Sequence, residues 1–415
     1  DRVLTNREAT WSSSNPAVAT VDASGLVTGV TPGGTTITAA SEGKQGGASL
    51  TVISGIDLGT LAGVNGICFN GVPDSCNSSA QDINASGQAV GWSNGSAAHP
   101  GSPHAFLWQP STTNGTTGTM HDLGTLGGNA SSALGINASG QVAGTSNVVF
   151  NGNDHVFLWT PNTPNGTTGT MIDLGLPEGS NAQGINDFGQ VTGVSLVGGW
   201  FQAWIWTPST ANGTSGTTTW LGTLGGGGAE AHDVNAFGQV VGTSNTASTS
   251  LHGFLWTPAS PNGTVGSMID LGTLGGSGSV TGYGINAGGQ VAGEVYGTTS
   301  DPWGPSHTFL WTPAAPNGTS GTMTDLGTMG GGFSGGFGLS ASGRVVGYRA
   351  LTSTCPCVPF LWTPAVPNGT SGTVTDFDTL GGSYAVANGL NAFHAVGYSE
   401  RPSPFGTRAT LWTIP

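Results

Sequence analysis

The sequence predicts an all-β protein, in which residues 54–415 form a seven-bladed β-propeller behind a small, incomplete N-terminal β-sandwich of residues 1–53. Three observations lead to this fold class. Two motifs recur seven times each at a spacing of about 50 residues, strand-forming residues fill the repeat, and no helical periodicity interrupts it. A repeat of this length with several short strands is typical of one propeller blade.

Two motifs define the repeat, one being DLGTLGG with its variants and the other an apolar run that ends in tryptophan. The first begins at Asp57, Asp122, Asp173, Trp220, Asp270, Asp325 and Asp376, and the second ends at Trp108, Trp159, Trp206, Trp256, Trp311, Trp362 and Trp412. We expect these tryptophans to fill the space between sheets, and the aspartates to accept N–H groups of the glycine turn that follows. Histidines that recur just before the apolar run are expected to pack or cap: His104, His155, His252 and His307.

Each repeat is predicted to contain four strands. In GINASGQVAG (135–144), Asn137 opens a turn and Gly140 closes it, because glycine adopts the left-handed conformation that a short hairpin needs. The segments on either side of this turn are the first two strands. A run such as HAFLW (104–108) is the third strand, and a segment such as TMIDLG (170–175) is the fourth.

The order of the units predicts how the ring closes. One DLG segment precedes the first repeat, and the last repeat ends on its third strand at LWTIP. A strand near residues 55–59 therefore completes the seventh blade beside Leu411 and Trp412. Such a seam hides strand edges that would otherwise invite aggregation.

The repeat units resemble the HAF-type extracellular repeats of bacteria, which are named after the triplet seen here at His104, Ala105 and Phe106. The resemblance covers about residues 55–415, where the DLG motif, the segment like GINASGQVAG and the apolar run ending in tryptophan recur in register. It implies an exported repeat protein, and it brings no catalytic residues with it.

Residues 9–53 resemble a bacterial Ig-like domain of group 2. The shared segments include WSSSNP from Trp11, VATVD from Val18 and GLVTGV from Gly25. Members of that family usually begin earlier, with two more strands, so we expect an open sandwich edge and an uncovered Trp11. Three explanations remain open: a sequence truncated upstream, an edge formed by residues 1–8, or strands supplied by a neighbouring chain.

Composition and charge exclude several classes of function. The chain has seven Lys and Arg against 21 Asp and Glu, a formal net charge of −14, so we expect no nucleic-acid partner. No apolar run reaches the roughly 20 residues of a membrane-spanning helix. Because charged residues are only 7% of the chain and hydroxyl residues abound, we expect export to the cell surface or the extracellular space.

The four cysteines form two close pairs. Cys68 and Cys76 share one inserted loop and are predicted to form a disulfide, because no histidine or third cysteine lies nearby to complete a metal site. Cys355 and Cys357 either close a tight ring or stay reduced. We expect neither a metal nor a cofactor.

Asn-Gly-Thr recurs six times between the predicted third and fourth strands. It matches the acceptor pattern for N-glycosylation, although Asn-Gly is also a favourable turn in its own right. The asparagines are Asn114, Asn165, Asn212, Asn262, Asn317 and Asn368.

Residues that interrupt the repeat are the candidates for ligand contact. Variable loops that share one face of the predicted propeller carry Phe150, Trp200 and Trp303. Exposed aromatic side chains on such loops are suited to binding carbohydrate or protein.

These observations predict a non-enzymatic extracellular structural protein, a subunit of a surface fibre whose copies join through Trp11 of the Ig-like segment. One alternative is a propeller that binds a glycan or another surface protein through its variable loops. Another is a hydrolase with an unrecognised site, although few acidic residues lie outside the repeat positions.

Overall fold

The computed structural model describes residues 9–30, 33–63, 68, 75–275, 278–297, 304–352, 356–402 and 406–414. Within these ranges all the secondary-structure elements are β-strands, and they form nine antiparallel sheets. The predicted all-β class is therefore confirmed.

The N-terminal unit consists of two small sheets. One contains β1 (Thr10–Ser13), β4 (Gly33–Ser41) and β5 (Lys44–Val52) in the order β1-β4-β5, and the other pairs β2 (Ala19–Val21) with β3 (Val27–Gly29). Val18, Ala19 and Val52 form a small core. Trp11 is 38% exposed, so its indole is partly uncovered as expected. One side of the indole packs against Gly25, where a larger residue would not fit.

The rest of the described chain forms seven four-stranded sheets, which we number 1 to 7. Sheet 1 contains β7 (Ser78–Ile83), β8 (Ala89–Ser93), β9 (His104–Pro110) and β10 (Gly118–Asp122), and sheet 2 contains β11 (Ser131–Ile136), β12 (Val142–Asn147), β13 (Asp154–Pro161) and β14 (Gly169–Asp173). Sheet 3 contains β15 (Asn181–Ile185), β16 (Val191–Val197), β17 (Trp200–Pro208) and β18 (Gly216–Trp220), and sheet 4 contains β19 (Gly225–Val234), β20 (Val240–Thr246), β21 (Leu251–Pro258) and β22 (Gly266–Asp270). Sheet 5 contains β23 (Val280–Ile285), β24 (Val291–Tyr296), β25 (Ser306–Pro313) and β26 (Gly321–Gly327), and sheet 6 contains β27 (Phe333–Leu339), β28 (Val345–Ala350), β29 (Cys357–Pro364) and β30 (Gly372–Asp376).

Sheet 7 is built from two distant parts of the chain. It contains β31 (Ala385–Leu390), β32 (His394–Glu400), β33 (Thr407–Thr413) and β6 (Gly55–Asp57). Ile56 lies opposite Leu411, and Gly55 lies opposite Trp412. The fourth strand of this sheet thus comes from the residues that follow the N-terminal unit.

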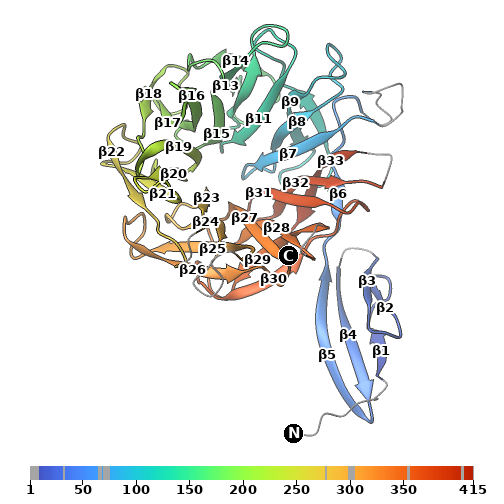
Figure 1. Cartoon of the computed structure of the whole chain (residues 1–415). Helices are drawn as coiled ribbons and strands as arrows, with labels where there is room; N and C mark the ends of the chain where they lie inside the picture. The colour runs from blue at the N-terminus through green and yellow to red at the C-terminus, as the bar shows by residue number, and fades with distance from the viewer. Residues whose placement is uncertain are drawn as a thin grey trace.

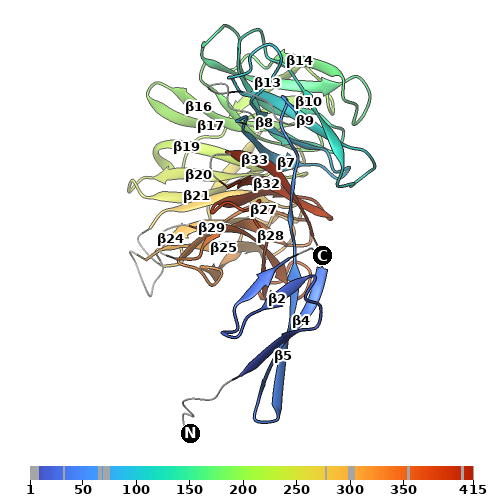
Figure 2. The same cartoon turned by 90° about the vertical axis from the view of Figure 1, so that its right-hand side faces the viewer.

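The seven sheets follow one another around a ring (Figure 1). The first strands of the sheets lie toward the centre, each contacts the first strand of the next sheet, and β31 contacts β7. The N-terminal unit projects beyond the ring in both views (Figures 1 and 2).

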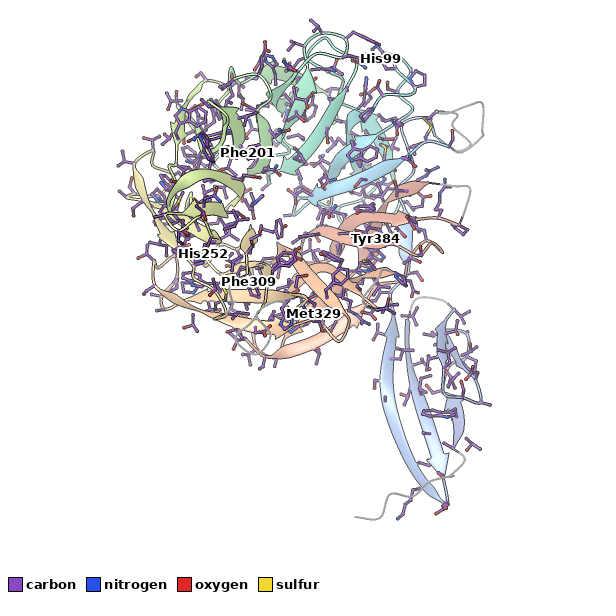
Figure 3. The ribbon with its side chains drawn as sticks, in the orientation of Figure 1. His99, Phe201, His252, Phe309, Met329 and Tyr384 are labelled. Carbon is purple, nitrogen blue, oxygen red and sulfur yellow. A yellow bond between two sulfur atoms is a disulfide. The ribbon has the colours of Figure 1, made fainter. Side chains whose placement is uncertain are left out.

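Apolar side chains fill the space between neighbouring sheets, and Phe309 is one that is fully buried (Figure 3). Leu107 of sheet 1, for example, packs with Phe157 and Trp159 of sheet 2. All seven repeated tryptophans are buried, as their position in the repeat predicts.

The turns also follow the repeat. Gly140 has a φ of 82°, and its N–H donates to the carbonyl of Asn137 at 3.0 Å, which confirms the predicted turn. The third strand is longer than expected, since β9 continues past Trp108 to Pro110. Proline still marks its end, because a proline has no N–H to donate.

Candidate functional site

The aspartates of the DLG motif hold the glycine turns that follow them. The Gly124 N–H donates to Asp122 Oδ1 at 2.8 Å, and the same bond recurs at Asp57, Asp173, Asp270 and Asp325. In sheets 1, 2, 4 and 5, Nδ1 of the repeated histidine lies 2.8–3.0 Å from the same carboxylate. These histidines and aspartates are therefore structural pairs, as their recurrence suggests.

The asparagines of the six Asn-Gly-Thr segments connect neighbouring sheets. Each has a φ of 52–59°, and its Oδ1 accepts a hydrogen bond of 3.0–3.4 Å from an asparagine in the first turn of the preceding sheet. We call these the inter-sheet asparagine pairs. They are Asn84–Asn165, Asn137–Asn212, Asn186–Asn262, Asn235–Asn317, Asn286–Asn368 and Asn391–Asn114.

The side-chain nitrogen of these residues is engaged as well. Nδ2 of Asn114, Asn165 and Asn212 donates to a backbone carbonyl in the first turn of its own sheet at 3.1–3.3 Å. Because N-glycosylation attaches at this nitrogen, a glycan would displace these bonds. The geometry favours the structural alternative for the Asn-Gly-Thr pattern.

Sheet 6 departs from the repeat at this point. Ser340 stands where the other six sheets have the turn asparagine, and Arg344 stands where sheets 1 to 5 have a glutamine. That glutamine, as in Gln88, donates to the carbonyl of the paired asparagine at 2.9 Å. In sheet 7 no loop joins the third and fourth strands, because β33 and β6 are separated by most of the chain. Ser340 and Arg344 thus occur in sheet 6, whose next neighbour, sheet 7, has no Asn-Gly-Thr segment for them to bind.

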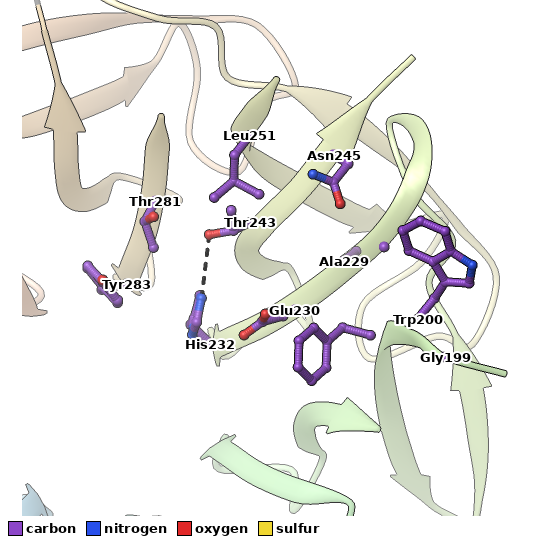
Figure 4. A pocket seen from close by; sticks show the side chains of 12 residues that line it. Gly199, Trp200, Ala229, Glu230, His232, Thr243, Asn245, Leu251, Thr281 and Tyr283 are labelled. Carbon is purple, nitrogen blue, oxygen red and sulfur yellow. Dashed lines mark hydrogen bonds between the residues drawn. The ribbon is translucent and has the colours of Figure 1, made fainter. Parts of the chain in front are cut away.

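Trp200 lies on the wall of a cavity of about 440 Å³ formed by sheets 3, 4 and 5, which we call the Trp200 cavity (Figure 4). Its lining consists of Gly199, Trp200, Phe201, Gly228, Ala229, Glu230, His232, Thr243, Asn245, Leu251, Thr281 and Tyr283.

Two glycine segments explain why the aromatic side chains reach this cavity. Gly198 and Gly199 have φ values of 63° and 85° and turn β16 into β17, which places Trp200 and Phe201 at the start of β17. The indole of Trp200 packs against Gly227 in the four-glycine run that begins β19, where a larger residue would not fit. Trp200 remains 58% exposed and Phe201 50% exposed.

Polar side chains of sheets 4 and 5 lie across the cavity from the aromatic wall (Figure 4). His232 Nε2 is 3.5 Å from Thr243 Oγ1, and burial lowers the pKa of His232 to about 4, so the imidazole is neutral at neutral pH. Burial also raises the pKa of Glu230. The pKa of Tyr283 is raised to about 12 by burial and by the charges of Glu294 and Glu230. The cavity therefore offers a carboxyl group, a neutral imidazole and a phenol.

The structure separates Phe150, another candidate contact residue, from this cavity. Phe150 is 69% exposed in the connection between β12 and β13, with its ring 6.3 Å from that of His99. Trp303 lies outside the described residues. Of the two candidates that the structure describes, Trp200 lines the cavity and Phe150 does not.

Sequence reasoning missed the polar side of the cavity. Glu230, His232 and Tyr283 stand on strands that look like ordinary repeat strands, and only the ring brings sheets 4 and 5 beside Trp200. The available signal was the run of four glycines from Gly225, which is longer than in the other units.

The predicted disulfide between Cys68 and Cys76 is confirmed, with a Cα–Cα distance of 4.9 Å. Cys357 is also disulfide-bonded, and Cys355 lies outside the described residues. Among the residues that the structure describes, no three or more His, Cys, Asp or Glu side chains are grouped as a metal site. The described ranges likewise contain no helix suited to crossing a membrane.

Residues 3–52 match the bacterial Ig-like domain (group 2) family, which confirms the resemblance noted for the N-terminal unit. No curated protein matches the chain. Domains of this family typically belong to surface or extracellular proteins, and the disulfide between Cys68 and Cys76 fits an oxidising environment.

Proposed function

We propose that residues 54–415 form a seven-bladed β-propeller of the HAF type, and that this module is non-enzymatic and binds an extracellular glycan in the Trp200 cavity. Support for the propeller comes from the seven four-stranded sheets, the contacts of β31 with β7, and the inter-sheet asparagine pairs. Support for an extracellular setting comes from the Ig-like domain and the disulfide.

One observation carries the proposal: two adjacent, half-exposed aromatic side chains stand over a cavity lined by hydrogen-bonding groups. A sugar ring has apolar C–H faces that stack on indole or phenyl rings, and a rim of hydroxyls that needs polar partners. Trp200 and Phe201 supply the first surface, while Glu230, Asn245 and His232 supply the second. Covering about 100 Å² of Trp200 contributes roughly 2–3 kcal/mol.

Binding is better supported than cleavage. Glycoside hydrolysis ordinarily needs two carboxyl groups on either side of the scissile bond. Among the residues that line the Trp200 cavity, Glu230 is the one carboxylic acid. We therefore place the hydrolase alternative behind the binding module.

The test compares two tryptophan variants on a glycan array, followed by calorimetry with the glycans retained. Trp200→Ala is expected to weaken binding at least tenfold, as the loss of one stacking surface predicts. Trp220→Ala is the matched control, because Trp220 is 45% exposed on β18 and does not line the cavity. Equal binding by the Trp200 variant, or no glycan bound by the wild-type chain, contradicts the proposal.

We propose assembly into a fibre through the N-terminal unit as a second function. Its support is the sheet order β1-β4-β5, which puts β1 and β5 at the two edges, and edge strands template pairing with another chain. Trp11 lines a cleft beside β1, together with residues of the loop that follows β2. Light scattering and electron microscopy of the wild-type chain and Trp11→Asp test this. Filaments formed by the wild type but not by Trp11→Asp support assembly through the N-terminal unit. A wild-type chain that stays monomeric at high concentration contradicts it.

A further inference from the structure

Two glutamates lie at or near the Trp200 cavity. Glu230 lines it directly, and Glu294 lies near enough to Tyr283 for its charge to raise the pKa of that phenol. Glu294 also accepts a hydrogen bond of 3.4 Å from the Tyr348 hydroxyl. A second cavity, of about 170 Å³, shares His232 and Tyr283 with the first and is lined by Asp82 and Asp233. Burial raises the pKa of Asp82 to about 6 and of Asp233 to about 7, so the negative charge at the Trp200 cavity comes chiefly from Glu230 and Glu294, in sheets 4 and 5.

No cationic side chain balances these acids at the cavity wall. None of the 12 lining residues, all of which belong to the described ranges, is lysine or arginine. His232 carries no charge at neutral pH, because burial lowers its pKa to about 4. The phenol of Tyr283 also stays protonated, since its pKa is raised to about 12 by burial and the nearby carboxylates.

An uncompensated negative site beside an aromatic wall is suited to a cation. The face of an indole attracts an ammonium group, and a carboxylate in partly desolvated surroundings strengthens that attraction. The same field repels ligands that carry carboxylates. Charge complementarity therefore narrows the class of glycan that the cavity accepts.

We infer that the Trp200 cavity selects glycans with free amino groups, such as glucosamine oligomers, over neutral N-acetylated and acidic ones. This inference rests on the proposed function. The sugar ring lies on Trp200 and Phe201, and its ammonium group lies beside Glu230. Glu294 does not line the cavity and acts at longer range, through its charge near Tyr283.

The experiment measures binding of the 415-residue chain to three oligosaccharides by calorimetry, at a pH that keeps the sugar amine protonated. The probes are a glucosamine tetramer, its fully N-acetylated counterpart and a galacturonate tetramer. The amine form is expected to bind about tenfold tighter than the N-acetylated form, and the galacturonate form is expected not to bind. Glu230→Gln should reduce the preference for the amine to about twofold or less.

Glu178→Gln is the matched control, since Glu178 is an exposed acid that does not line the cavity. If the wild type binds the amine and N-acetylated tetramers equally and Trp200→Ala binds neither, the inference is overturned, whereas the proposal of glycan binding in the Trp200 cavity is supported. Binding of a lysine-rich peptide with no glycan bound overturns both. If Glu230→Gln does not fold, the same electrostatic preference is tested with Glu294→Gln and with the wild type at raised salt. A preference for the amine tetramer that is unchanged in both experiments refutes the inference.

Discussion

The inter-sheet asparagine pairs are expected to stabilise the ring, and Asn137→Ala tests this directly. Asn137 is buried, and its Nδ2 donates to Gln141 Oε1, to the Asn186 carbonyl and to Asn212 Oδ1 at 3.0–3.2 Å. Its Oδ1 accepts the N–H groups of Ser139 and Gln141 at 3.0–3.1 Å. Removing the amide leaves several buried partners without a bond, at about 1 kcal/mol or more each. We expect the free energy of unfolding to fall by about 3–5 kcal/mol.

Ser340→Ala is the matched control, because Ser340 occupies the same turn position in sheet 6. Its hydroxyl oxygen accepts the Arg344 N–H at 3.0 Å and lies 3.1 Å from the Ser342 hydroxyl oxygen, so its loss should cost about 1 kcal/mol or less.

Urea unfolding followed by the fluorescence of the 13 tryptophans measures both variants against the wild type. The lower stability of Asn137→Ala should appear as a lower urea concentration at the unfolding midpoint, with an unchanged dependence of the unfolding free energy on urea. Equal midpoints for Asn137→Ala and Ser340→Ala would refute the reasoning, since the bonds to sheet 3 would then contribute nothing measurable.

Three further predictions concern the disulfide, the seam and the buried acids. Replacing Cys68 and Cys76 by serine should lower the free energy of unfolding by about 2 kcal/mol, and peptide mapping of the wild type without reductant should show the link; free thiols at both positions would contradict it. Deleting residues 1–59 removes β6 and should lower the melting temperature of the remaining ring, whereas an unchanged melt would place the seam elsewhere. Burial raises the pKa of Asp82 to about 6 and of Asp233 to about 7, so protonation favours the folded state. Their contribution to stability is full below the ordinary aspartate pKa of 3.8 and is lost as pH rises from there through about 6 to 7. Replacing both by glycine should therefore flatten the pH dependence of the free energy of unfolding, measured in urea, between about pH 4 and pH 7.

Local features were readable from the sequence, because their partners lie a few residues away. The turn at Asn137–Gly140 and the glycine turns after the DLG aspartates need only short-range hydrogen bonds. The Cys68–Cys76 link is likewise contained in one loop. Repetition at fixed spacing then made the sheets predictable, since each unit repeats the same four-strand pattern.

Features that join neighbouring sheets could not be read in the same way. Asn114 and its equivalents fit a glycosylation pattern, and their bonding partners are turn asparagines that the sequence alone does not pair with them. Glu230 and Tyr283 come from sheets 4 and 5, while Trp200 comes from sheet 3. Trp200 was recognisable because it interrupts the repeat, whereas the polar side of its cavity belongs to strands that follow the repeat.

The short link between the N-terminal unit and the ring has a mechanical consequence. β5 ends at Val52 and β6 begins at Gly55, so a pull on the N-terminal unit reaches sheet 7 through two residues. Ile53 is packed with Trp412, and its carbonyl accepts the Asp378 N–H at 2.9 Å, which anchors the link where the tension enters. Tension would load the bonds between β6 and β33 before those of the other sheets. We therefore expect the pairing of β6 with β33, which has three residue pairs in register, to be the first part of the ring to separate under tension.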